Sequence, residues 1–208
     1  MVEKCKKWGI SKRMKRLGIY LIYDKQNIID RYIGYMMNEL QTCTDYLVAV
    51  CNMTEIRCGA GILEHYADEI FYRKNVGFDA GGFKETLCNF IGWDRVLEYD
   101  ELILVNDSMF GPFKPMKSIF SEMDERPVDF WGLAKQGRRN KESVLNYKEY
   151  IQSYFLVIRY AMLHDIRFRD YWENMPYYEE FWDVVFQYEE KFTAHFFEMG
   201  YTYDVLAD

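Results

Sequence analysis

At 208 residues the chain is long enough for one domain with a substantial core, and a composition that is 50% hydrophobic and 18% aromatic excludes a disordered protein. The net charge of −7 argues against general nucleic-acid binding. Five cysteines form no C-x-x-C pair, which favours free thiols over a disulfide framework or a zinc site and so predicts a cytoplasmic location.

The first 16 residues differ in charge from the rest of the chain. They hold seven basic residues and one acid, and no hydrophobic signal-peptide segment follows them. We interpret 1–16 as a basic N-terminal arm that precedes a domain over 17–208. A solvated leader is the favoured interpretation. The alternative is a peripheral contact with anionic lipid at the inner face of the membrane, at about 1 kcal/mol per basic residue.

Short apolar runs alternate with amphipathic stretches through the domain. The apolar runs predict buried strands over 17–23, 46–51, 69–72, 102–105, 128–134 and 151–158. The amphipathic stretches predict helices over 28–43 (capped by Asn27), 59–65, 80–91, 115–123 and 178–199. This alternation predicts an α/β fold with a mostly parallel, twisted sheet, helices on both faces and a long C-terminal helix that stops at Gly200. The polar residues 137–148 are predicted to be a surface loop.

A polar tripeptide follows the fully apolar strand predicted at 102–105. Asn106, Asp107 and Ser108 then stand at the carboxyl end of a central strand, where open α/β sheets bind their ligands. A carboxylate, an amide and a hydroxyl packed this closely suit a metal, a diphosphate or a sugar. The alternative is a turn in which these side chains bond only their own backbone.

A second polar segment, residues 73–84, follows the strand at 69–72 and opens a helix. Gly77 and Gly81 let a ligand approach the backbone closely, and the free N–H groups of a new helix favour an anion. Asn75 and Asp79 add polar side chains, and Asp79 either caps the helix or bonds a sugar hydroxyl. The spacing fits neither G-x-G-x-x-G nor a P-loop, so it does not predict a dinucleotide site.

Four segments together resemble the rhamnan synthesis protein F family, bacterial glycosyltransferases that build rhamnose-containing cell-surface polysaccharides. They are N-x-G-x-D-x-G-G at 75–82, N-D-S-x-x-G-P at 106–112, D-F-W-G at 129–132 and Q-S-Y-F at 152–155. The resemblance runs from about residue 17 to the C-terminus. It implies a GT-A-like fold and an inverting transfer of a sugar, L-rhamnose, from a nucleotide diphosphate donor such as dTDP-L-rhamnose to a glycan or lipid-linked acceptor in polysaccharide biosynthesis.

The resemblance also implies roles for the residues of the N-D-S-x-x-G-P motif at 106–112. In GT-A enzymes a D-x-D-like motif at a strand end holds a divalent metal on the donor diphosphate, so Asp107 is the expected ligand of Mg²⁺ or Mn²⁺. Asn106 and Ser108 would bind the donor beside it, together with Asn75, Gly77, Asp79 and Gly81. The motif here offers one carboxylate instead of two, which leaves metal dependence open.

The remaining candidates lie in the C-terminal half. Asp129 is either the base that deprotonates the acceptor hydroxyl or an acid at a strand edge. Glu189, on the terminal helix, either reaches the cleft as a catalytic base or lies on a solvated helix face. Trp131, Gln152 and Tyr154 are predicted to contact the acceptor. A non-catalytic nucleotide-sugar or glycan-binding module with the same fold is the alternative to an enzyme.

Overall fold

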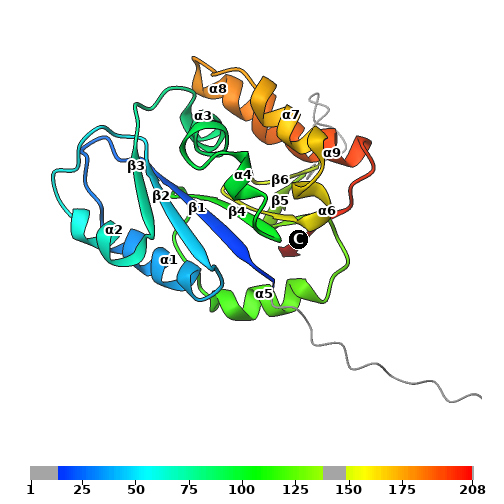
Figure 1. The fold of residues 1–208 in the computed structure, drawn as a ribbon, viewed down its shortest axis with the longest axis horizontal. Helices are drawn as coiled ribbons and strands as arrows, with labels where there is room; N and C mark the ends of the chain where they lie inside the picture. Colours follow the sequence, from blue (N-terminus) through cyan, green and yellow to red (C-terminus); the bar gives the residue numbers. More distant parts are fainter. Residues whose placement is uncertain (1–13, 138–148, 208) are drawn as a thin grey trace, which may run out of the picture.

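The computed structural model describes residues 14–137 and 149–207, which form an eight-stranded sheet in the order β3-β2-β1-β4-β7-β5-β6, with β8 beside β5 (Figure 1). The strands β1 to β4 are parallel to one another, and β8 is parallel to β5. The strand β7 runs antiparallel to both β4 and β5, and β6 is antiparallel to β5. Their bounds are β1 Arg16–Ile22, β2 Tyr46–Cys51, β3 Glu69–Tyr72, β4 Glu101–Asn106, β5 Phe130–Gln136, β6 Tyr150–Ile151, β7 Phe155–Arg159 and β8 Tyr203–Ala207. The predicted α/β class with a mostly parallel sheet is confirmed.

Helices cover both faces of this sheet (Figure 1). One face carries α1 (Arg31–Gln41), α2 (Ala60–Tyr66) and α5 (Met116–Asp124). The other face carries α3 (Phe78–Glu85), its continuation η1 (Thr86–Phe90), α4 (Trp93–Val96), α6 (Tyr160–Leu163), α7 (Ile166–Asn174) and the C-terminal helix. The C-terminal helix consists of α8 (Phe181–Val184), the π-helical turn η2 (Val185–Glu189) and α9 (Glu190–Glu198), so the long helix predicted at 178–199 is confirmed over 181–198.

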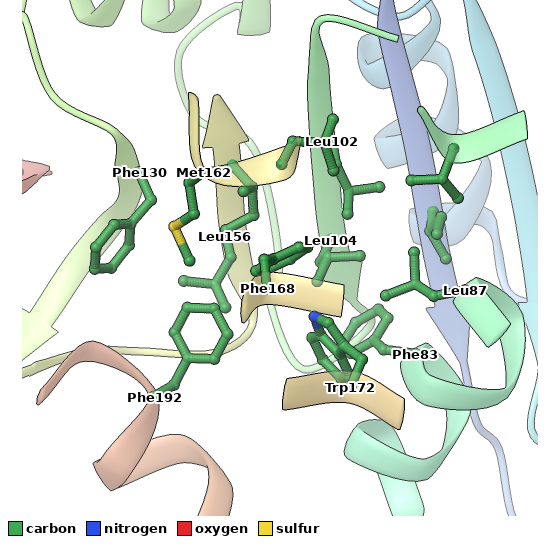
Figure 2. Packing of buried hydrophobic residues seen from close by; sticks show 14 of the residues in the cluster. Phe83, Leu87, Leu102, Leu104, Phe130, Leu156, Met162, Phe168, Trp172 and Phe192 are labelled. Carbon is green, nitrogen blue, oxygen red and sulfur yellow. The ribbon is translucent and has the colours of Figure 1, made fainter. Parts of the chain in front are cut away.

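The side-chain alternation of β4 divides the core into two layers. Leu102 and Leu104 point to the α3 and α7 side, whereas Ile103 and Val105 point to the α1 and α5 side. Figure 2 shows the first layer, in which the rings of Phe83 and Trp172 meet edge to face beside Leu104. Because β4 is buried on both faces, its polar groups can reach a ligand only where the strand ends.

Two predicted elements need correction. The first helix begins at Arg31 and is capped by Asp30, because Asn27 adopts a left-handed conformation (φ 61°) in the preceding turn. The run predicted as one strand over 151–158 is two strands, β6 and β7, separated by a turn. The helices α4, α6 and α7 and the final strand β8 were not predicted.

The N-terminal arm and the predicted loop fall mostly outside the described residues, which exclude 1–13 and 138–148. Arg16, included in the predicted arm, is the first residue of β1. Its Nε donates to the buried Glu101 at 2.6 Å and its NH2 group donates to Asp124 at 2.9 Å, so this residue is part of the folded domain. Over the described ranges, none of the helices is both long and apolar enough to span a bilayer.

Candidate active site

A cavity of about 590 Å³ opens where β1 and β4 end, and the first turns of α3 and the C-terminal helix form its other walls. This is the carboxyl edge of the parallel strands, where ligands bind in open α/β sheets. Seven of the predicted site residues line it: Asn75, Asp79, Asn106, Asp107, Ser108, Tyr154 and Glu189. The two polar segments singled out in the sequence therefore meet in space.

Asn106 links the two segments directly. Its Nδ2 donates to Asp79 Oδ2 at 2.6 Å, and its Oδ1 accepts from the backbone N–H of Ser108 at 3.0 Å. Burial raises the pKa of Asp79, while the bond from Asn106 and the charge of Arg73 oppose that rise. Asn106 therefore serves both as a turn residue and as the support that orients Asp79.

Asp107 lies at the junction of β4 and β1. Its Oδ2 accepts from the backbone N–H of Tyr23 at 3.0 Å, which joins the ends of the two strands. The pKa of Asp107 is raised to about 6, first by burial and then by the charges of Asp79 and Asp24, against the lowering effect of the Tyr23 bond. Burial and the neighbouring acids therefore disfavour the ionised form of Asp107 at neutral pH.

Arg73 holds the loop that leads into α3. Its guanidinium is buried and donates to Glu85 (2.6 Å), to the backbone oxygen of Val76 (2.6 Å) and to Asn52. The side chain of Asn52 in turn donates to the backbone oxygen of Phe78 at 3.3 Å. Sequence analysis missed both of these supports, although Asn52 directly follows a strand, which is a signal that could have found it.

Phe78 is held in a conformation that a non-glycine residue rarely adopts. Its φ of 53° is left-handed, and the strain of such a residue is about 1–3 kcal/mol. Its ring lines the cavity and meets the ring of Phe181 edge to face, with centroids 6.0 Å apart. Strained backbone of this kind is concentrated at functional sites, and here it orients a cavity wall.

Gly77 and Gly81, in the N-x-G-x-D-x-G-G motif, lie close to neighbouring parts of the chain. Gly77 is left-handed (φ 74°), and a Cβ there would lie 3.0 Å from Gly81 and from the ring of Tyr177. A Cβ on Gly81 would lie 2.4 Å from the backbone oxygen of Val76. Both glycines thus allow close approach of the chain to itself, and neither is among the residues that line the cavity, so their donor-binding role stays a prediction.

Asn75 offers an unsatisfied acceptor in the same cavity. Its side-chain oxygen is buried without a hydrogen-bond partner among the described residues. Buried polar atoms are nearly always paired in folded proteins. A hydroxyl of a bound ligand would supply the missing donor, which supports the predicted donor-binding role of this residue.

Glu189 reaches the cavity from the π turn of the C-terminal helix. In that turn the backbone N–H of Glu190 bonds to the carbonyl of Val185, five residues back. Burial and the charge of Asp79 raise the pKa of Glu189, whereas hydrogen bonds from the backbone and hydroxyl of Ser153 lower it. A carboxylate fixed in this way, with an elevated pKa, suits a general base.

Three predicted site residues, Asp129, Trp131 and Gln152, do not line this cavity. Asp129 precedes β5 at the opposite edge of the sheet, where its carboxylate accepts from the N–H and hydroxyl of Thr202, both at 2.8 Å. Trp131 is fully buried against Phe120, with centroids 5.1 Å apart. Gln152 does not line the cavity, and its amide donates to Gln136 at 3.4 Å. Sequence order alone could not show that Asp129 and Asp107 lie at opposite strand ends.

The described residues hold no group of three or more His, Cys, Asp or Glu side chains arranged to bind a metal ion by themselves. Mg²⁺, however, is commonly held by one or two carboxylates together with the phosphates of a substrate. Asp107 fits that mode, because it is a carboxylate with a raised pKa beside the further acids Asp79 and Asp24. Among the described lining residues Lys25 is the one basic side chain.

The fold and cavity define an α/β protein with a polar ligand site at the carboxyl edge of its parallel strands. The chain belongs to the rhamnan synthesis protein F family, whose sequence pattern matches residues 47–208. The resemblance inferred from the four motifs is thereby confirmed.

Other proteins are similar over most of the chain. The protein y4gN of Sinorhizobium fredii, described as uncharacterized, is 25% identical over 185 residues, which is 89% of this chain and 46% of that protein. The chain thus spans about half the length of the curated relative it matches.

Among solved structures, a 4-diphosphocytidyl-2C-methyl-D-erythritol synthase has a TM-score of 0.58 at 9% identity, covering 94% of this chain and 90% of the other. The synthase of Anaerococcus prevotii has a TM-score of 0.51 at 11% identity, covering 93% and 89%. At these identities the similarity concerns the fold alone.

Proposed function

We propose that this chain is a glycosyltransferase domain that moves a sugar from a nucleotide diphosphate donor to a glycan during polysaccharide synthesis. The observation that carries the proposal is the convergence of Asp107 and Glu189 on one cavity at the carboxyl edge of the sheet. One acid lies where the diphosphate would bind, and the other lies on the opposing wall, where an acceptor would approach. Membership of the rhamnan synthesis protein F family supports L-rhamnose as the sugar and dTDP-L-rhamnose as the donor.

A divalent cation is part of this proposal. Three acids, Asp79, Asp107 and Glu189, face the cavity against a single lysine among the described lining residues, so a diphosphate would meet net negative charge. Bound Mg²⁺ or Mn²⁺ would supply the positive charge that stabilises the leaving diphosphate. Asp107 would hold it, with Asn106 and Ser108 fixing the turn that presents Asp107.

The proposed reaction is a single in-line displacement with inversion. Glu189 accepts the proton of the acceptor hydroxyl, and the acceptor oxygen forms a bond to the anomeric carbon. The bond from that carbon to the diphosphate oxygen breaks, and the nucleoside diphosphate leaves with the electron pair. Ser153 holds Glu189 in place, and Asn75 is positioned to bind a donor hydroxyl.

The second candidate function is a binding module without turnover. One observation favours it: the N-D-S motif carries one carboxylate. Such a module would bind the donor without cleaving it. The basic N-terminal arm and a location at the inner face of the membrane stay part of the proposal in either case.

Release of dTDP from dTDP-L-rhamnose in the presence of Mg²⁺ or Mn²⁺ tests the proposal, with donor affinity measured by calorimetry on the same samples. Asp107→Asn keeps the shape of the side chain and removes its charge, so dTDP release is expected to fall at least about a hundredfold, or about 2.7 kcal/mol. Asp129→Asn, from the opposite edge, is the control and should keep its rate. Binding without release in wild type would instead support the binding module.

A further inference from the structure

A second cavity, of about 910 Å³, adjoins the first along the start of the C-terminal helix. The two cavities share Phe181, Val185 and Glu189 in their lining. Glu189 therefore stands on the wall between them, with the end of β5 on the far side of the second cavity at Gln136. The shared residues make the two spaces neighbouring parts of one site.

Three large rings line this second cavity and stay exposed to solvent. Phe181 is 54% exposed, Trp182 64% and Phe186 42%. Trp182 and Phe186 stack with their planes 21° apart and their centroids 5.8 Å apart, which groups the two rings into one apolar cluster. Exposed apolar surfaces of this kind mark binding sites, because leaving such rings in water is unfavourable.

The polar groups of the cavity select the kind of ligand. Glu189 and Glu190 contribute carboxylates, and Gln136 contributes an amide at the rim. The described residues that line it include no lysine or arginine. Hydroxyl groups can donate to these carboxylates, whereas a phosphate would be repelled by them. A pyranose ring matches this arrangement, with an apolar C–H face for the aromatic surface and hydroxyls around its edge.

We propose that this aromatic cavity binds the non-reducing end of a neutral glycan acceptor, with a sugar ring on Trp182 and Phe186 and its nucleophilic hydroxyl directed at Glu189. The proposal rests on the glycosyltransferase function proposed above and identifies the acceptor class. The volume of the aromatic cavity lies at the upper end of the range of ligand pockets, roughly 300–1,000 Å³, and suits more than one sugar unit. The acceptor is thereby reassigned from Trp131 and Gln152, which do not line either cavity.

The test measures sugar binding without any donor. Saturation-transfer NMR and calorimetry are applied to a neutral rhamnose trisaccharide and to the same trisaccharide carrying a phosphate on its non-reducing end. The variant is Trp182→Ala combined with Phe186→Ala. Both rings are exposed, so the fold should persist, and the melting temperature and far-UV spectrum verify that it does. The matched control is Phe197→Ala, which removes an exposed ring of the same helix outside the cavity.

Wild type and Phe197→Ala are expected to bind the neutral trisaccharide through its ring C–H protons, with Kd raised about tenfold or more in the double variant. Unchanged affinity in a folded double variant, no binding by wild type, or tighter binding of the phosphorylated sugar would each overturn the proposal. Donor hydrolysis by water, measured separately, is expected to be equal in wild type and Phe197→Ala. Loss of hydrolysis in wild type would refute the proposed function alone, because the sugar-binding result is obtained without donor.

Discussion

Asp107→Asn is expected to stabilise the metal-free protein at neutral pH, although the same change should abolish most activity. The ionised carboxylate is desolvated and repelled by Asp79 and Asp24, and these effects raise its pKa from 3.8 to about 6. An asparagine removes the charge and keeps an oxygen that can accept from the Tyr23 N–H. A protein can trade stability for function at its active site in this way.

The magnitude follows from proton linkage. Because the carboxyl binds its proton more tightly when folded, the destabilisation grows as the pH rises through the interval between the two pKa values. For pKa values of 3.8 and about 6 the upper limit is about 3 kcal/mol at pH 7.5 and about 1.6 kcal/mol at pH 5. Allowing about half of this for solvent screening, we expect Asp107→Asn to gain about 1.5 kcal/mol at pH 7.5 and less than 1 kcal/mol at pH 5.

Urea unfolding at pH 7.5 and pH 5 measures the change in the free energy of unfolding caused by Asp107→Asn. EDTA is present so that no cation offsets the charge of Asp107. Asp94→Asn, an exposed acid on α4, is the control and should change the free energy of unfolding by no more than about 0.5 kcal/mol at either pH. A less stable Asp107→Asn protein at pH 7.5 would refute the reasoning, and so would a gain that does not depend on pH. Either result would mean that the carboxylate has structural partners that compensate its charge.

Three further predictions concern the supports of the site. Gly77→Ala should lower the free energy of unfolding by about 1–2 kcal/mol, because the residue is left-handed, yet leave donor affinity unchanged in a thermal-shift titration; weaker donor binding by the folded variant would return this glycine to the ligand site. Glu189→Gln should reduce sugar transfer about 10²–10⁴-fold with donor affinity intact, and an unchanged rate would exclude it as the base. Arg16→Ala leaves the buried Glu101 with Arg159 at 3.3 Å and should destabilise the protein by about 3 kcal/mol in urea unfolding, whereas a negligible loss would show that Arg159 is sufficient.

The sheet could be predicted from the sequence because its strands are buried on both faces. Runs such as 46–51 and 102–105 are continuously apolar, bounded by polar or turn residues, and correspond to β2 and β4. The strand β8 was missed because it follows the helix-stopping Gly200 and reads as a polar tail, Thr202 to Asp204. Its strand character comes from pairing with β5, which is a tertiary effect.

The candidate site was predictable to the extent that it follows strand ends. Asp107 was identified because it closely follows an apolar run, and Asp79 because it lies in the polar segment 73–84 that follows a strand and opens a helix; the structure brings both to one cavity. Asp129 was misplaced because it precedes its strand, and β5 runs in the same direction as β4. The aromatic cavity was not predicted, although Trp182 and Phe186 are large rings off the apolar face of the predicted C-terminal helix, which is a signal that could have found it.

The π turn in the C-terminal helix sets the angular phase of everything after it. The inward residues Val184, Tyr188, Phe192 and Phe196 recur at intervals of four, and in a regular α-helix each such step would rotate by about 40° away from the sheet. The wider turn at 185–189 rotates in the opposite sense and returns the later rings to the core, while it leaves Glu189 facing the cavity. It is in effect a one-residue insertion tolerated within a helix. With one residue deleted there, the helix could not both pack the rings of α9 in the core and keep Glu189, the proposed base, in the cavity.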